Sequence, residues 1–165
     1  MKCHKCGKAD LVKDIEIFEY GQANLPYKVM LVGVPVKRCP ACRERVVTIP
    51  DPDGLHRALC LHMVEGSRTL HPAEIRFLRK YLDKSAEEWA AVMGVDKKTL
   101  SRWENGRQKM GPVAERLLRL LVHQQLRPDA GSFSEEMFPK LRDERGGPPA
   151  SVKLASSPRG WRQAA

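Results

Sequence analysis

Residues 94–106, Gly-Val-Asp-Lys-Lys-Thr-Leu-Ser-Arg-Trp-Glu-Asn-Gly, decide the fold of the second half of the chain. Gly94 can adopt the positive φ that ends a preceding helix, and Asp96 can cap the free amides of a new helix. The apolar residues of this segment recur on one helical face, and its lysines, serine and arginine fall on the other. The pattern predicts a short helix whose cationic face suits the major groove of DNA, with a solvated basic surface as the alternative.

The residues before this segment favour DNA binding over a solvated surface. Ser85 and Glu88 have the spacing of a capping box, which opens a helix with Trp89 on its apolar face. Two helices joined by a tight glycine turn, the second of them cationic, form a helix-turn-helix. We therefore expect residues 71–127 to form an all-α helix-turn-helix domain that binds double-stranded DNA.

Residues 72–121 resemble the helix-turn-helix of phage-repressor (Xre) type, most specifically in the run from Met93 to Gly106. The resemblance implies base contacts from the second helix and phosphate contacts from the residues that follow it. The base-reading sites fall on Lys97, Lys98 and Arg102, the neighbouring hydroxyls on Thr99 and Ser101, and the phosphate contacts on Asn105, Arg107 and Lys109. Arg79 and Glu104 occupy the positions of a structural ion pair between the first and third helices of that family.

Length and charge agree with a basic DNA-binding unit inside a small protein. The 165 residues can form two small domains, and the formal net charge is +9. Residues 67–127 carry 13 Lys and Arg against 7 Asp and Glu, so the excess lies on the expected DNA-binding segment. The sequence offers no membrane-spanning apolar run, signal peptide, carboxylate cluster for Mg²⁺ or catalytic triad. We expect a soluble, cytoplasmic protein that is not an enzyme.

Four of the five cysteines form two pairs with identical spacing. Cys3 and Cys6 make the first Cys-x-x-Cys pair, and Cys39 and Cys42 make the second. Two such pairs supply a closed tetrahedral set of four thiolates, which favours one structural zinc ion per chain. Disulfides and a redox-active Cys-x-x-Cys are the alternatives. The absence of an export signal and the presence of a second pair weigh against them.

The predicted fold class is α+β with two domains. Residues 12–20, 27–36 and 46–49 read as strands of a small sheet that zinc clamps, because a core of this size needs such support. We expect a zinc domain over 1–64, a flexible linker over 65–70, the DNA-binding domain over 71–127 and a disordered tail over 128–165. A leucine-rich helix after Gly111 completes the second core, and its surplus apolar face can form a homodimer. A purely intramolecular core is the alternative.

Residues 1–127 as a whole resemble MqsA-type (YgiT-type zinc finger) antitoxins. The Met-Lys-Cys start, both cysteine pairs, the wide gap between them and the order of the two domains carry this resemblance. It implies zinc ligands Cys3, Cys6, Cys39 and Cys42, and a zinc domain that binds a cognate toxin, an mRNA-cleaving RNase. It also implies a second domain that dimerises and represses its own operon, for which a palindromic operator is expected. A stand-alone zinc-containing transcriptional regulator without a toxin partner is the alternative.

Overall fold

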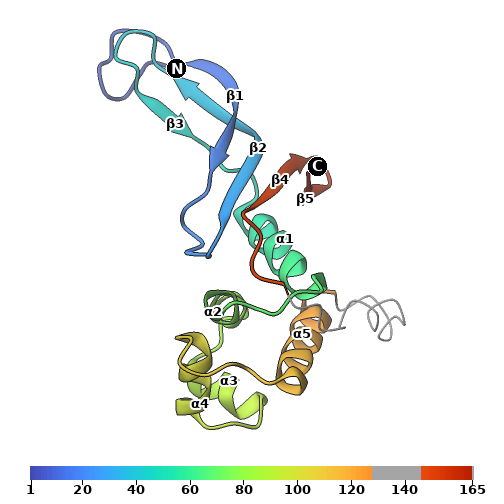
Figure 1. Cartoon of the computed structure of the whole chain (residues 1–165). Coiled ribbons are helices and arrows are strands. Elements are labelled where there is room, and N and C mark those ends of the chain that lie inside the picture. Colours follow the sequence, from blue (N-terminus) through green and yellow to red (C-terminus); the bar gives the residue numbers. More distant parts are fainter. Residues whose placement is uncertain (128–145, 165) are drawn as a thin grey trace.

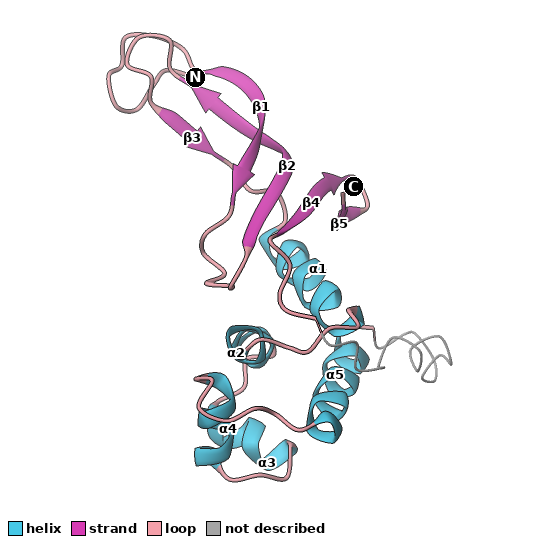
Figure 2. Cartoon of the chain, viewed as in Figure 1, coloured by secondary structure: helices cyan, strands magenta, loops and turns pink. Residues whose placement is uncertain are grey.

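The computed structural model of the chain describes residues 1–127 and 146–164 and has an α+β architecture (Figures 1 and 2). A mixed sheet occupies one end of the molecule, and the five described helices lie along the chain between its first three strands and its last two. The strands are β1 (Val12–Glu19), β2 (Lys28–Arg38), β3 (Arg45–Val47), β4 (Ser151–Ser157) and β5 (Gly160–Gln163). The helices are α1 (Pro52–Glu65), α2 (Pro72–Tyr81), α3 (Ala86–Val92), α4 (Lys97–Glu104) and α5 (Pro112–Leu126).

β2 is the central strand of the sheet. β1 pairs antiparallel along one edge of β2, and a bulge places Val32 and Gly33 opposite Ile17. Gly33 adopts φ 80° there, a conformation that glycine allows at little cost. The other edge of β2 is shared, since β3 pairs antiparallel with residues 36–38 and β4 pairs parallel with residues 28–32. The three strands expected from the amino-terminal sequence are confirmed to within a few residues at each end.

The prediction of a disordered tail over 128–165 is wrong for its last part. Residues 151–163 form the hairpin β4–β5, which extends the sheet beyond β2. Val152 and Leu154 are buried, and the Trp161 indole Nε1 donates to the carbonyl oxygens of Pro50 and Asp51 at 2.9 and 3.1 Å. Apolar and polar residues alternate with a period of two in β4, which favours a strand with one buried face. Residues 128–145 of the expected tail lie outside the described residues.

Local capping residues set the boundaries of the helices. Ser85 and Glu88 form a reciprocal capping box at the start of α3, and the Asp96 carboxylate accepts from the Thr99 amide at the start of α4. Gly94 adopts φ 66° in the turn between these two helices. α2 begins with a further capping box, in which His71 and Glu74 exchange hydrogen bonds. These interactions satisfy backbone groups that a helix end leaves free.

One apolar core connects the sheet with the helices. α1 lies beneath the sheet and contacts α2, α5 and β5 (Figure 1). Its buried residues Leu55, Leu59 and Met63 belong to a single cluster that runs from Tyr20 in the sheet region to Leu126 at the end of α5. The two parts of the chain therefore share apolar burial, whereas the zinc domain and DNA-binding domain were expected to have separate cores.

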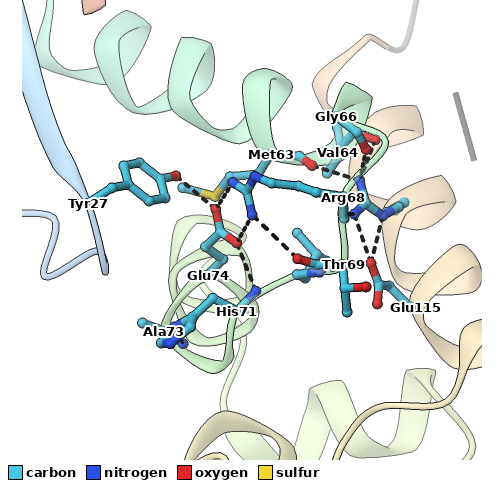
Figure 3. A network of polar contacts seen from close by, with 12 residues as sticks. Tyr27, Met63, Val64, Gly66, Arg68, Thr69, His71, Ala73, Glu74 and Glu115 are labelled. Carbon is cyan, nitrogen blue, oxygen red and sulfur yellow. Dashed lines mark hydrogen bonds and ion pairs between the residues drawn. The ribbon is translucent and has the colours of Figure 1, made fainter. Parts of the chain in front are cut away.

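The segment 65–70, expected to be a flexible linker, is held by buried ion pairs (Figure 3). Arg68 forms a two-pronged ion pair with Glu74 of α2, with N–O distances of 2.7 and 2.5 Å. The hydroxyl of Tyr27 in the loop before β2 donates to the same carboxylate at 2.8 Å. Glu74 is fully buried, so this contact joins the β1–β2 loop to α2 in the interior.

A second buried pair fixes the other side of the same segment. The Arg119 guanidinium lies 2.8 Å from the Glu115 carboxylate and donates to the carbonyl oxygens of Met63 and Gly66 at 2.8 and 2.6 Å. Glu115 in turn accepts from the backbone amide of Leu70 at 2.9 Å. These interactions satisfy carbonyl groups at the end of α1 that no helical partner reaches. The segment is thus a fixed junction between α1, α2 and α5.

Candidate metal centre and basic surface

The four paired cysteines come together at the end of the sheet that lies far from the helices. The sulfur atoms of Cys3, Cys6, Cys39 and Cys42 all lie within 4.8 Å of one another. The Sγ–Sγ distance is 3.6 Å both between Cys3 and Cys42 and between Cys6 and Cys39. An ion held tetrahedrally about 2.3 Å from each sulfur requires sulfurs roughly 3.8 Å apart. The arrangement fits a four-coordinate metal ion.

Two turns of the same geometry present these cysteines. In the first, the Gly7 amide donates to the Cys3 carbonyl at 2.9 Å; in the second, the Arg43 amide donates to the Cys39 carbonyl at 2.9 Å. The residue after each second cysteine is left-handed, with φ 66° at Gly7 and 58° at Arg43. Glycine adopts this conformation readily, whereas arginine does so at a cost. A glycine directly after a Cys-x-x-Cys pair is a recognisable turn signal, whereas the arginine at position 43 gives no sign in the sequence that it has the equivalent role.

The cysteine cluster favours a bound cation on electrostatic grounds. A hydrogen bond from the Cys42 amide lowers the pKa of Cys39 to about 7. The Glu44 amide lowers the pKa of Cys42, but burial and the neighbouring thiols outweigh it and raise that pKa to about 12. Four thiolates at this spacing repel one another, and a divalent cation removes that repulsion. Such an ion would use all four sulfurs as ligands, so it would stabilise the two turns and leave no site for water activation.

The residues predicted to bind DNA lie together on α4 and the loop after it. Leu100 and Trp103 of α4 face the core, and Lys98 and Arg102 lie exposed on the opposite side. Lys98 and Arg102 are four residues apart, so one face of the helix presents both. The remaining members of the predicted set are Lys97, Thr99, Ser101, Asn105, Arg107 and Lys109; all are exposed except Thr99, which is half-buried.

Four of the predicted DNA-binding residues already have intramolecular side-chain partners, and among them the Ser101 hydroxyl accepts from the Asn105 side-chain nitrogen at 3.2 Å. Lys97 forms an ion pair with Glu87 of α3. The Thr99 hydroxyl donates to Asp96 at 2.8 Å and so contributes to the cap of α4. The Asn105 amide nitrogen donates to the Ser101 carbonyl at 2.7 Å, within the last turn of α4. Lys98 and Arg102 are therefore better placed than Lys97, Thr99 or Asn105 for new contacts.

An ion pair connects α2 with α4 and sets the position of α4. Arg79 donates to both carboxylate oxygens of Glu104, at 2.6 and 3.0 Å, and to the Lys84 carbonyl at 2.8 Å. Arg76, which the sequence analysis missed, lies one helical turn earlier on α2. It donates to the Asn105 side-chain oxygen at 2.5 Å. The sequence did contain a signal for this role of Arg76. It is a cation three residues before Arg79, and residues three apart on a helix share a face.

A second surface missed by the sequence analysis lies on β1. Ile15 and Ile17 have exposed fractions of 72% and 62%, and Val12 nearby is 58% exposed. β1 is also an edge strand, with one row of backbone groups open to a partner. Exposed branched apolar residues on a sheet edge are typical of a protein-binding surface. Their alternation with charged residues in the sequence was the signal for an outward-facing row.

Comparison with known proteins assigns the chain to a family. The family described as "Antitoxin component of bacterial toxin-antitoxin system, MqsA" matches residues 1–129. No curated protein matches the chain. No helix in the described ranges has the length and apolar character needed to cross a membrane. The family match includes all four clustered cysteines and the five helices of the described residues, and stops before the hairpin β4–β5. The chain belongs to the MqsA family, the antitoxin components of bacterial toxin–antitoxin systems.

Proposed function

We propose that this antitoxin neutralises a toxin through its amino-terminal sheet and represses its own operon by binding DNA through α4. The observation that carries the proposal is the presence, in one MqsA-family chain, of a four-cysteine cluster and an exposed basic helix. The cluster sits at one end of the molecule and α4 at the other (Figure 1). Toxin and DNA could therefore be bound at the same time.

The DNA-binding part of the proposal rests on α3, α4 and the turn between them, which we interpret as a helix-turn-helix. The apolar side of α4 is buried, and the ion pair of Arg79 with Glu104 holds the helix against α2. Lys98 and Arg102 can then reach base edges in the major groove, where both side chains favour guanine. Arg107 and Lys109, exposed in the following loop, supply sequence-independent phosphate contacts.

A homodimer would allow the antitoxin to bind a palindromic operator. α5 supports this arrangement, because Val113 and Leu117 are exposed while Leu118 and Val122 face the core. An apolar row on the outer side of a helix is available for packing against its symmetry mate. We propose that two chains associate through α5, which would place two copies of α4 on successive turns of the operator.

The toxin-binding part of the proposal assigns the exposed side of β1 to the toxin, an RNase. Ile15 and Ile17 offer apolar area that the chain itself does not cover. The metal, which we take to be Zn²⁺, would hold together the cysteine turn before β1 and the one between β2 and β3, and would keep the sheet rigid. A rigid surface binds with a smaller loss of conformational entropy than a loose one.

Two measurements test the proposed function. The protein, co-expressed with the product of the neighbouring small gene, should co-purify with that product and contain one zinc ion per chain. It should also retard a DNA fragment carrying its own promoter, and retard an unrelated fragment only at higher protein concentration. Failure to bind any neighbouring gene product would exclude toxin neutralisation, and equal retardation of both fragments would exclude operator recognition.

A further inference from the structure

We propose that a pocket between the β1–β2 loop and α2 is a phosphate-binding site. The pocket has a volume of about 340 Å³, within the range of small-ligand sites. Gln22 and Asn24 line it from the loop, His56 lines it from α1, and Arg76 and Lys80 line it from α2. It therefore lies between the sheet region and the helices, away from the cysteine cluster and from the exposed side of β1.

The charge of the pocket favours an anion. Arg76 and Lys80 are four residues apart on α2, a spacing at which like charges repel each other. No carboxylate belongs to the described residues that line the pocket. The nearest carboxylate partner is Glu104, whose Oε2 lies 3.7 Å from the Arg76 Nε. Glu104 is already held by Arg79 at 2.6 and 3.0 Å, so one carboxylate serves two guanidinium groups and positive charge remains at the rim.

Arg76 also connects the pocket with the basic surface of α4. Its Nη2 donates to the Asn105 side-chain oxygen at 2.5 Å and to the Glu104 carbonyl at 3.3 Å. Both ends of the Asn105 amide are thus used within the protein, because its nitrogen donates to Ser101. Arg76, whose side chain is 43% exposed, is then the cation beside Asn105 that can bind a phosphate. In this arrangement Asn105 is a positioning residue, because its side-chain oxygen holds the Arg76 guanidinium at the pocket rim.

A phosphate could reach this pocket from two sources. The backbone of the bound operator could place a phosphate there, and this part of the inference rests on the proposed DNA binding. A free phosphate or a phosphorylated small molecule could also bind, since the His56 and Phe77 rings provide an apolar wall, packed edge to face with centroids 5.7 Å apart. The two sources share one chemistry, a tetrahedral oxyanion held by Arg76 and Lys80, and they predict different experimental results.

The DNA arm of the test measures the salt dependence of promoter binding by fluorescence anisotropy. Arg76→Gln and Lys80→Gln are compared with Lys13→Gln, which removes an exposed cation on β1. If the pocket holds a backbone phosphate, each of the first two variants should reduce the slope of log K against log salt, by up to about 0.9, because each removes one of the two cations that hold this phosphate. Lys13→Gln should keep the wild-type slope. Matching melting temperatures for the three variants would show that all are folded.

The second arm uses inorganic phosphate as the probe and follows the wild-type protein by NMR in a phosphate-free buffer. If the pocket takes free phosphate, resonances of His56 and Phe77 should shift saturably, and Arg76→Gln should abolish the shift while Lys13→Gln preserves it. A protein that binds phosphate but no DNA would refute the proposed operator binding and support this site. If both pocket variants have the salt slope of Lys13→Gln and phosphate produces no saturable shift, the site does not exist.

Discussion

At the scale of single residues, the cysteine cluster depends on backbone conformations as much as on sulfur. Gly7 and Arg43 have the same left-handed φ in equivalent turns, yet only one of them is glycine. The Cβ atom of a residue such as arginine clashes with backbone in this region, at a cost of roughly 1–2 kcal/mol. The second turn therefore contains strain that the first turn lacks.

Replacing Arg43 by glycine should stabilise the metal-bound protein. Relief of the left-handed strain outweighs the larger entropy that glycine adds to the unfolded chain, which is about 0.4–1 kcal/mol. We expect a net gain of up to about 1 kcal/mol in the free energy of unfolding, measured by urea denaturation. Ala41→Gly in the same turn, where φ is not positive, is the control and should only destabilise. Destabilisation by both substitutions would show that Arg43 is not strained.

The proposed DNA-binding residues should separate into two kinds. Arg102→Ala should lower affinity for the operator by about 1–3 kcal/mol and relax sequence preference at one base pair, because we propose that its guanidinium contacts a base edge. Lys109→Ala should weaken binding to all sequences alike and reduce the salt slope. Gel shifts with operator and scrambled DNA at several salt concentrations distinguish them. Equal effects of both variants on specificity would contradict the assignment.

At the scale of elements, the junction between α1 and α2 is an interior ion pair. Burial raises the pKa of Glu74, but hydrogen bonds from Arg68 and from the His71 amide outweigh it and hold that pKa below its ordinary value of 4.5. A carboxyl whose pKa is lowered on folding stabilises the protein above its unfolded pKa, and the stabilisation is lost as the pH falls through the folded pKa. The junction should therefore weaken only in acid.

Glu74→Gln should destabilise the protein strongly at neutral pH. Breaking a buried pair by removing one charge costs about 3–5 kcal/mol, because the Arg68 guanidinium would stay buried without its counter-ion. The difference from wild type should begin to shrink as the pH falls below about 4.5, where the unfolded carboxyl takes up a proton. It should be lost once the pH falls through the lower folded pKa, because the wild-type carboxyl is then protonated as well. Urea denaturation from pH 3 to 7 measures this. Glu19→Gln, which breaks only the exposed pair with Lys28, should cost less than about 1 kcal/mol at every pH.

The hairpin β4–β5 should contribute to the stability of the whole sheet. Leu154→Ala removes a buried side chain that packs beside β2, and we expect a loss of about 2–5 kcal/mol in the free energy of unfolding. Arg159→Ala, in the exposed turn between β4 and β5, should leave stability within about 0.5 kcal/mol of wild type. Guanidinium denaturation of both variants provides the comparison. Equal stability of the two would mean that the hairpin is not packed against the sheet.

The elements that the sequence predicts well are those with local signals. The capping box at Ser85, the cap at Asp96 and the turn at Gly94 each involve residues that are close in sequence. The hairpin was missed because the glycines and prolines before it dominate the composition of the tail and hide the short alternation at 151–155. The long-range hydrogen bonds at the junction could not be predicted, because Tyr27 and Arg119 donate to residues 47 and 56 positions away.

At the scale of the whole molecule, packed and hydrogen-bonded parts connect the two proposed functional regions. α1 contributes to the core shared by sheet and helices, and the segment 65–70 is held from both sides by Arg68 and Arg119. The sequence predicted two domains with a flexible linker, since short polar segments containing glycine usually have that role. Apolar contacts and buried charges between distant residues override this local preference. The cysteine cluster and α4 nevertheless remain far apart, so their functions can be tested separately.

Growth rescue tests the central claim most directly. The neighbouring toxin gene is induced in cells that also express the wild-type chain, Cys39→Ser or Arg102→Ala from an unrelated promoter. We predict that the wild type and Arg102→Ala restore growth, because neutralisation does not use the basic surface of α4. Cys39→Ser should fail to restore growth, because the sheet loses its metal ion. Growth arrest in cells with the wild-type chain, or full rescue by Cys39→Ser, would contradict the account.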